Sequence, residues 1–546
     1  MNNRKYIIPF IFAAILGASC SKDNGEDKDQ GEDKVQGVTG DNTQVTVAPD
    51  RERILLKNPL SGWVTYSGIG SGLADNYWDF YDNLPCADAP DGSGQVSVWD
   101  YSNVLYIKAD WADMNPEDGV YIWEEQYQDY SDFARRLKIL MDGAKERGLK
   151  IAFTINTNSE GDHDNSTPDF VREEDPSSCY TTTTGSATVY SGYPDHPVFQ
   201  KYYEKFVKAF AARFNNPDEV EFISGLGLGK WGECHTFRYS TETTIATGDD
   251  SPKEAVYDWA TSLYADNFTR VPVVTNYHKF VGCTTGEGTT GDPDSEGLLQ
   301  SAIDKGFSMR HDAFGMKNSG WGYGPWERNF IAARRYKVPV IGEGGWVQSS
   351  HDFTSDYANA RELREGEYDA MAGAYVNMMD FRYSSSMATS ETCSWFNDAF
   401  DLVLQFLQEG VYRLYPNQLY VPESVSAGST VTLRSRWANL GNAYFPADLK
   451  QWEGRYKMAY ALLDKSTGEP VRVFVDENAA LQNVVKNSMQ VFDTEITVSD
   501  VPAGSYTWGL AIVNTQKDNT PAIELSVPED RLSAGGWLEL ADIVIE

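Results

Sequence analysis

One pattern in this sequence limits the fold more than any other. Between about residues 54 and 415, short apolar runs alternate with amphipathic stretches that have the spacing of helices. Parallel strands joined by helices produce this alternation, because the strands are buried on both faces while each helix keeps one face in water. We predict eight strands, near residues 62–66, 104–108, 150–155, 222–228, 271–276, 307–312, 338–342 and 375–381, with helices near 130–147, 199–214, 254–264, 329–336 and 395–407.

Eight such units predict an α/β fold, a (β/α)8 TIM barrel over residues 51–415. Polar insertions at 73–94, 160–194, 236–252 and 284–296 each follow a predicted strand, where barrel loops build functional sites. After residue 415 the apolar residues alternate with period two, as in 429–437, and turn signals separate the runs. Residues 416–546 are therefore predicted to form a C-terminal antiparallel β-sandwich.

The N-terminus has the features of a secretory signal. Arg4 and Lys5 precede an apolar run over 6–16, and small residues lead to Cys20. The sequence before Cys20 resembles a lipobox, which implies that residues 1–19 are removed and that Cys20 is acylated. Residues 20–50 are acidic and poor in apolar residues, so we expect a disordered tether. The acidic run resembles the export signal of surface lipoproteins, which implies a lipid anchor in the outer membrane and exposure at the cell surface. A secreted protein without a lipid is the alternative.

Charge and motif content exclude several classes of function. The formal net charge is −34 and no basic block occurs, which argues against nucleic-acid binding and against a strongly anionic polysaccharide. No HExxH or comparable spacing is present, so we expect neither a metal nor another cofactor. Aromatic residues make up 13% of the chain, a surplus that serves either sugar stacking or a large core.

Two glutamates stand out by their position. Glu233 follows a predicted strand and a glycine-rich segment that includes Gly225, Gly227 and Gly232, and Glu343 ends another predicted strand. Glycosidic cleavage needs two carboxyl groups, one to protonate the leaving oxygen and one to attack the anomeric carbon or to activate water. A pair at these strand ends would meet at the barrel mouth. Taken singly, each glutamate could equally be a solvated loop residue.

Glutamates that end strands four and seven resemble those of the clan A glycoside hydrolases, which are retaining (β/α)8 enzymes. The resemblance implies that Glu233 is the acid/base and Glu343 the nucleophile. Residues 110–123 are similar to a turn after strand two of such barrels, with matching Trp111 and Trp123. Gly232 stands where the clan has asparagine, and this region is also similar to β-amylase-like barrels, which invert. Both stereochemical outcomes therefore stay open.

We accordingly predict a hydrolase that cleaves a neutral or weakly charged oligo- or polysaccharide, working beside glycan-uptake machinery at the cell surface. The rival hypothesis is a surface glycan-binding lipoprotein without catalytic activity, which would not need both glutamates. Aromatic and polar residues near the predicted strand ends are candidates for sugar contacts, although core packing is an equally good explanation for them. These candidates are Trp63, Trp111, Asn156, Trp231, His235, Tyr277, His278, His311 and Trp346.

Overall fold

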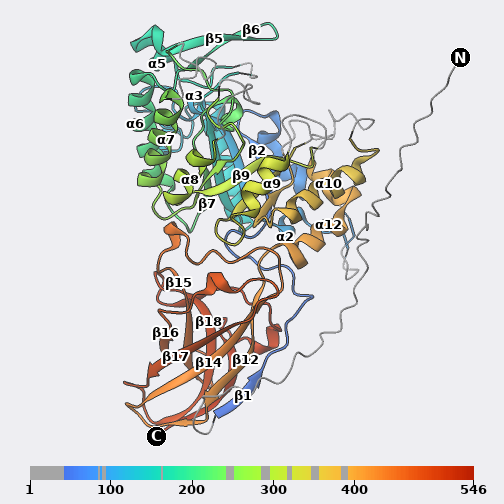
Figure 1. Cartoon of the computed structure of the whole chain (residues 1–546), viewed down its shortest axis with the longest axis vertical. Coiled ribbons are helices and arrows are strands. Elements are labelled where there is room, and N and C mark those ends of the chain that lie inside the picture. Colours follow the sequence, from blue (N-terminus) through green and yellow to red (C-terminus); the bar gives the residue numbers. More distant parts are fainter. Residues whose placement is uncertain are drawn as a thin grey trace, which may run out of the picture. The chain divides into compact units, whose positions relative to one another are not determined.

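The computed structural model describes residues 42–83, 87–88, 94–160, 164–241, 251–283, 295–316, 323–345, 356–382 and 391–546. The barrel and the C-terminal sheets both belong to one unit, Gly40–Glu546 (Figure 1). Among the helices of the described residues, none is long and apolar enough to cross a membrane.

The barrel is closed by eight parallel strands, which confirms the predicted fold class. The strands follow one another around the barrel in sequence order, with β11 closing against β2. They are β2 (Gly62–Gly68), β3 (Ser102–Asp110), β4 (Lys150–Asn156), β7 (Val220–Ser224), β8 (Val273–Asn276), β9 (Ser308–Phe314), β10 (Val340–Gly344) and β11 (Met378–Asp380). Each of the eight predicted strands is present, with shifted ends.

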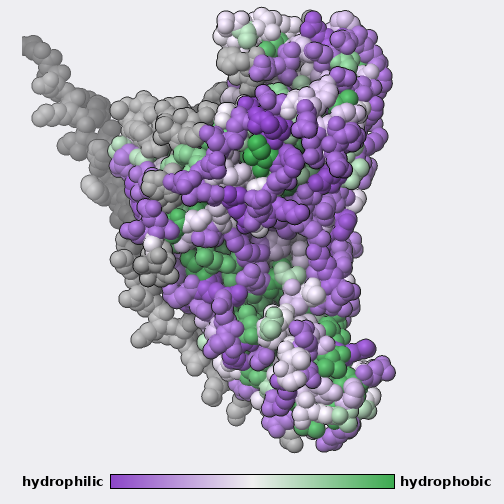
Figure 2. All heavy atoms as spheres, turned by 180° about the vertical axis from the view of Figure 1, so that it is seen from behind, coloured by the Kyte–Doolittle hydropathy of each residue, from purple (hydrophilic) through white to green (hydrophobic). Residues whose placement is uncertain are grey.

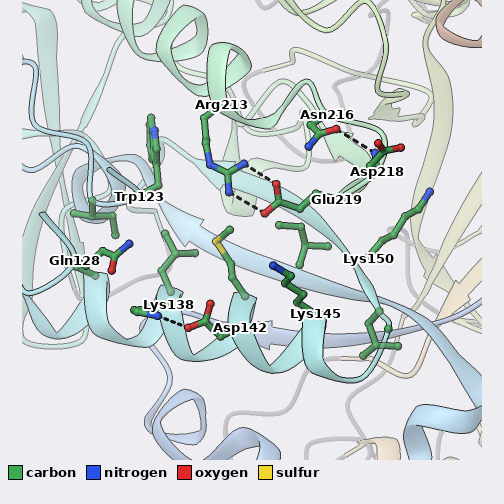
Figure 3. Close-up of a pocket in the computed structure, with 17 residues that line it drawn as sticks. Trp123, Gln128, Lys138, Asp142, Lys145, Lys150, Arg213, Asn216, Asp218 and Glu219 are labelled. Atoms are coloured by element: carbon green, nitrogen blue, oxygen red, sulfur yellow. Dashed lines mark hydrogen bonds and ion pairs between the residues drawn. The ribbon is translucent and has the colours of Figure 1, made fainter. Parts of the chain in front are cut away.

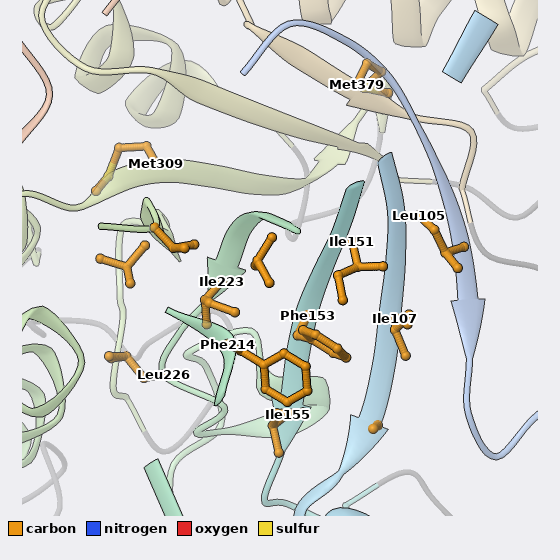
Figure 4. Packing of buried hydrophobic residues seen from close by; sticks show 14 of the residues in the cluster. Leu105, Ile107, Ile151, Phe153, Ile155, Phe214, Ile223, Leu226, Met309 and Met379 are labelled. Atoms are coloured by element: carbon orange, nitrogen blue, oxygen red, sulfur yellow. The ribbon is translucent and has the colours of Figure 1, made fainter. Parts of the chain in front are cut away.

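Helices cover the outside of the barrel where the apolar periodicity predicted them. Outward-facing strand residues such as Leu105, Ile107 and Phe153 pack beneath these helices in one buried cluster (Figure 4). The longer helices are α4 (Asp132–Glu146), α6 (Pro197–Phe214), α7 (Ser251–Asn267), α8 (Glu296–Asp304), α9 (Pro325–Ala332), α10 (Ala360–Gly373) and α11 (Glu391–Asp398). Shorter ones include α1 (Tyr77–Asp82), α2 (Val98–Tyr101), α3 (Trp111–Met114), α5 (Asp169–Glu174) and α12 (Phe400–Gln405). A hairpin, β5 (Cys179–Thr184) and β6 (Ala187–Gly192), lies in the predicted insertion after β4.

Two sheets with one shared core form the C-terminal part, as the period-two alternation predicted. One sheet has the order β1, β12, β14, β17, and the other has β13, β20, β18, β15, β16, with β19 beside β18. Their bounds are β1 (Asn42–Thr46), β12 (Leu414–Pro422), β13 (Ser424–Val425), β14 (Thr430–Asn439), β15 (Tyr456–Asp464), β16 (Pro470–Val475), β17 (Gln490–Thr497), β18 (Gly504–Asn514), β19 (Thr520–Ile523) and β20 (Leu538–Ile545).

The edge strand β1 corrects the predicted tether. Asn42–Thr46 pairs antiparallel with β12, so the predicted disordered segment 20–50 is wrong over these residues. Val45 and Val47 supply the reason, because both side chains are buried in the core of the sheets. Residues 20–41, including Cys20, lie outside the described residues.

The interior of the barrel is apolar at one end and polar at the other. Inward-facing Val64, Val104, Phe222 and Ile341 share a cluster with core residues of the two C-terminal sheets. That end of the barrel is therefore closed largely by apolar packing, with the ion pair of Lys150 and the buried Glu221 beside it. The mouth of the barrel lies at the opposite end, where the strands finish. The molecular face in Figure 2 is mostly hydrophilic, with apolar residues in small groups.

Candidate active site at the barrel mouth

The strand before Glu233 is shorter than predicted. β7 ends at Ser224, so the predicted extension to Leu228 is wrong, and Glu233 lies in the glycine-rich loop that follows the strand. Gly227 and Gly229 have φ values of +68° and +77°, which remove the backbone from the strand conformation. A Cβ atom at Gly227 would lie 2.0 Å from the carbonyl oxygen of Ile155, so only glycine allows this approach to β4.

Backbone hydrogen bonds fix the loop on both sides. The amide of Thr157, after β4, donates to the carbonyl of Gly227 at 2.9 Å. On the other side, the amide of Gly282, after β8, donates to the carbonyl of Cys234 at 2.8 Å. Glu233 is therefore held between the loops that follow β4 and β8, in a position that sequence spacing alone does not reveal.

Imidazole and carboxyl groups surround Glu233. His235 Nε2 lies 3.2 Å from Glu233 Oε2, and His278 Nε2 lies 3.1 Å from the backbone carbonyl oxygen of Glu233. The ligand-type atoms of Glu233, His235 and Asp312 all lie within 4.8 Å of one another. Burial lowers the pKa of His235 to about 4, so its ring is neutral at neutral pH. Both histidines were predicted to contact sugar, and the structure places them against Glu233.

Asp312 is a member of this cluster that we did not predict from the sequence. Its Oδ2 accepts a hydrogen bond from Asn276 Nδ2 at 3.3 Å, and its Oδ1 lies 4.0 Å from His278 Nε2 and 3.9 Å from His311 Nδ1. Burial and the nearby Glu233 carboxylate both raise the pKa of Asp312. Its place near the end of a predicted strand, two residues after a buried arginine, was the signal available in the sequence.

The cluster has the donor types of a metal site, so we tested the fit. Glu233, His235 and Asp312 form one group with ligand-type atoms within 4.8 Å, and His278, His311 and Asp312 form another. However, His278 Nε2 is hydrogen-bonded to a backbone carbonyl, and His311 Nδ1 accepts from the amide of Ala313 at 3.1 Å. Because these two nitrogens are already engaged, we interpret the group of His278, His311 and Asp312 as a hydrogen-bonded network.

Glu343 has a different set of partners. Ile341 faces the barrel interior, and strand alternation turns Glu343 to the same side. Arg310 Nη2 donates to Glu343 Oε2, and Arg382 Nη1 is paired with Glu343 Oε1. Two guanidinium groups thus place positive charge against the carboxylate of Glu343, which is only 3% exposed.

A second carboxyl group belongs to the Glu343 cluster. Asp380, at the end of β11, accepts from Arg310 Nη2 at 3.2 Å. Burial raises the pKa of Asp380 to about 6, although Arg310 opposes the shift. The guanidinium of Arg310 also lies 4.7 Å from the centre of the Tyr106 ring, inside the barrel. We did not predict Arg310, Asp380 or Arg382. The signal was the charge of Arg310 and Asp380 in otherwise apolar strands, with Arg382 directly after the second of these predicted strands.

The two clusters lie at the same end of the barrel. Arg310 and Asp312 are alternate residues of β9, so their side chains point to the same face and their Cα atoms are roughly 6–7 Å apart. One binds Glu343, and the other belongs to the Glu233 cluster. The structure therefore brings both predicted glutamates to the mouth of one barrel.

Trp231 is the exposed aromatic residue beside Glu233. It is 37% exposed, its ring centre lies 6.0 Å from that of His235, and Lys230 Nζ lies 4.2 Å from the ring centre. A solvent-accessible indole at this position is suited to stacking on a sugar ring. Trp346, the other tryptophan predicted near a glutamate, lies outside the described residues.

Three predicted sugar contacts are wrong because their side chains are fully buried in the core. Trp63 stacks on Phe381 with ring centres 4.5 Å apart and is 0% exposed. Trp111 and Tyr277 are also 0% exposed. These residues pack among the covering helices, so core packing, the alternative explanation, is correct for them.

Two further residues that were predicted to contact sugar have fully buried side chains with partners inside the protein. Asn156 is fully buried, and its Nδ2 donates to Asp110 Oδ1 at 3.1 Å and to the carbonyl of Asn158 at 2.9 Å. His311 is also fully buried, and burial lowers its pKa to about 3. A direct sugar contact is therefore wrong for both, since neither side chain reaches the surface.

A cavity elsewhere on the barrel does not compete with this site. It has a volume of about 710 Å³ and is lined by residues of α4, the end of α6 and the start of β4 (Figure 3). Arg213 pairs there with Glu219, and Lys138 pairs with Asp142. Its lining from Gly148 to Ile151 belongs to the N-terminal side of β4, opposite the strand end that leads to the mouth.

Comparison with known proteins yields remote likenesses only. No protein-family model matches the sequence, and no curated protein matches it. Endo-glycoceramidase II from Rhodococcus sp., as its lactosyl-enzyme intermediate, is similar in structure with a TM-score of 0.35 and 14% identity, over 83% of this chain and 100% of that chain. An endogalactoceramidase is similar in structure with a TM-score of 0.35 and 12% identity, over 77% of this chain and 94% of that chain. An exo-β-1,4-mannosidase from Opitutaceae bacterium strain TAV5 has a TM-score of 0.35 and 10% identity, over 65% of this chain and 62% of that chain. At such TM-scores these likenesses support no argument about function, and the fold assignment rests on the strand order itself.

Proposed function

We propose that this protein is a glycoside hydrolase that cleaves a neutral or weakly charged glycan, with Glu233 as acid/base and Glu343 as nucleophile. One observation carries the proposal: the two carboxyl groups have opposite electrostatic surroundings. Two guanidinium groups bind Glu343, whereas imidazole and carboxyl groups surround Glu233. An acid must hold a proton and a nucleophile must not, so this contrast supports these two roles.

The residues can divide the reaction as follows. Glu233 gives its proton to the glycosidic oxygen, and the bond from that oxygen to the anomeric carbon breaks. Glu343 attacks the anomeric carbon and forms a glycosyl ester, which water hydrolyses after Glu233 has taken a proton from that water. If the enzyme inverts, Glu343 activates water directly. Trp231 provides an exposed face for the sugar beside Glu233.

The cellular setting is part of the proposal. Cys20 is the acylated residue, and the lipid anchors the protein in the outer membrane with the barrel exposed at the cell surface. Oligosaccharides released there would pass to glycan-uptake machinery. The signal sequence and the acidic segment after Cys20 support this location.

A specific observation favours a second candidate, a glycan-binding protein without catalytic activity. Both oxygens of Glu343 are engaged by arginines, so a substrate must compete with these ion pairs before attack can occur. The same arginines and Trp231 would also suit a site that only binds a sugar.

Digestion of a panel of neutral glycans with the purified protein tests the proposal. We expect reducing ends to appear for at least one glycan, and Glu343→Gln should abolish turnover while binding persists. Glu233→Gln should slow glycans far more than activated aryl glycosides, whose leaving groups need little protonation. Lys138→Gln, on the outer side of α4, is the matched control and should keep full activity. Tight glycan binding with no cleavage between about pH 4 and 8 would replace the hydrolase with the binding protein.

A further inference from the structure

We propose that Asp312 is a positioning residue that shares a single proton with Glu233, so that the pair, and not Glu233 alone, is the proton donor of the site. The inference rests on the proposed function, because it explains how Glu233 keeps a proton. It assigns a role to a residue that the glutamate pair by itself does not require.

Geometry is the first support. Asp312 comes from β9 and Glu233 from the loop after β7, and their carboxyl oxygens lie within 4.8 Å of each other. Asn276 Nδ2, at 3.3 Å, holds Asp312 from the intervening strand β8. Side-chain exposures of 9% for Asp312 and 19% for Glu233 leave Glu233 as the member that a substrate can reach.

The charges around the pair are the second support. His278, from the loop after β8, and His311, from β9, interact directly with Asp312. Lys230 and Glu160 act on the neighbouring His235, and Arg310 acts on His311. His235 and His311 are neutral at neutral pH, since burial lowers their pKa values. Arg310 is bound to Glu343 and Asp380, and Lys230 lies over Trp231.

Two buried carboxylates repel each other strongly, and a shared proton removes most of that cost. The pKa of Asp312 shifts in the direction that a shared proton requires, because burial and then the charge of Glu233 raise it. When two carboxyl groups lie close together, their titrations are coupled, and the proton belongs to the pair and not to either residue.

The proton balance of the reaction follows. In the resting site one O–H bond serves both carboxyl groups, and the pair has one negative charge. When Glu233 protonates the glycosidic oxygen, that O–H bond breaks, the O–H bond of the released alcohol forms, and the pair has two negative charges. The repulsion makes Glu233 a stronger base for the incoming water, whose proton restores the single charge of the pair.

The pH profile of kcat/KM tests the role of Asp312. Asp312→Asn keeps the shape and a hydrogen-bonding group but removes the second negative charge. We expect the basic limb of the profile to move to lower pH by about one to two pH units, with activity retained at the acidic end. Asp476→Asn, at a buried aspartate of the C-terminal sheets that binds Thr494, is the control and should leave the limb unmoved. Equal loss of activity at every pH in Asp312→Asn would overturn the proposal.

Infrared difference spectroscopy tests the shared proton without turnover. In the Glu343→Gln background at neutral pH, either Asp312→Asn or Glu233→Gln should remove the same protonated-carboxyl band, because one proton serves both residues. The band should persist in Asp476→Asn. Burial also raises the pKa of Asp113, so the band of that residue remains in every variant. A spectrum that loses no band in either site substitution would overturn the shared proton. If no glycan is cleaved but the band behaves as expected, the hydrolase assignment fails while the shared proton stands.

Discussion

Arg310 and Asp312 are alternate residues of β9 that project from one strand into different halves of the same site. Arg310 binds the carboxylate of Glu343, and Asp312 lies beside the carboxyl group of Glu233. One strand thus supplies a positive group to one glutamate and a negative group to the other. In the proposed mechanism, these opposite charges match the different roles of the two glutamates.

Removal of the Arg310 charge should destabilise the barrel as well as stop the reaction. Arg310→Met leaves Glu343 and Asp380 buried with less compensation, so we expect a loss of about 3–5 kcal/mol in the free energy of unfolding. Urea denaturation measures the loss. Arg434→Gln breaks the ion pair with the half-exposed Asp493 and should cost less than about 1 kcal/mol. Similar costs for the two variants would contradict a buried ionic cluster.

Asp113 should make stability depend on pH. Burial, and then the neighbouring Asp110 and Asp164, raise the pKa of Asp113 to about 8. The native state therefore retains a proton that the unfolded state releases near pH 4, so the free energy of unfolding falls as pH rises from about 4 to 8. Asp113→Asn should stabilise the protein at about pH 9 by on the order of 1–3 kcal/mol and change it little at about pH 4.

Urea unfolding of wild type and Asp113→Asn across this range measures the effect. Asp142→Asn, at an exposed residue of α4, is the control and should leave the pH dependence of wild type intact. Parallel stability curves for wild type and Asp113→Asn would show that Asp113 is ionised in the folded protein.

The exposed and the buried tryptophans should respond differently to substitution. Trp231→Ala should weaken glycan binding about three- to tenfold through lost stacking and change stability by less than about 1 kcal/mol. Trp63→Ala should instead cost about 3–5 kcal/mol in unfolding free energy, since its ring is enclosed by Phe381, Trp395 and Phe406. Calorimetric titration and thermal unfolding separate the two effects. Unchanged affinity in Trp231→Ala would remove it from the site.

Anchoring should depend on one thiol. Cys20→Ala prevents acylation, so we expect the protein to leave the membrane fraction and appear in the soluble fraction. Metabolic labelling with a fatty acid should mark the wild type and not the variant. Ser21→Ala, next to the acylation site, is the matched control and should keep both the label and the membrane association. A correctly processed Cys20→Ala protein that stays on membranes would refute the lipid anchor.

The sequence by itself determined the succession of elements. Strand and helix periods depend on local neighbours, so the eight barrel strands and the alternating C-terminal run over 429–437 were predictable, as were Glu233 and Glu343 after predicted strands. Strands such as β1 and β12 were missed because their pairing joins residues far apart in the chain. Periodicity shows which residues are apolar, and it does not show which distant segment will cover them.

Tertiary structure alone decided which candidates share the site. Trp63 and Trp231 are equally aromatic in the sequence, but only the second faces solvent. Arg310, Asp312 and Arg382 acquired their significance when barrel closure placed them beside the two glutamates. The physical reason is that burial and charge pairing depend on distances across the barrel. A sequence pattern indicates only on which face of its own helix or strand a residue lies.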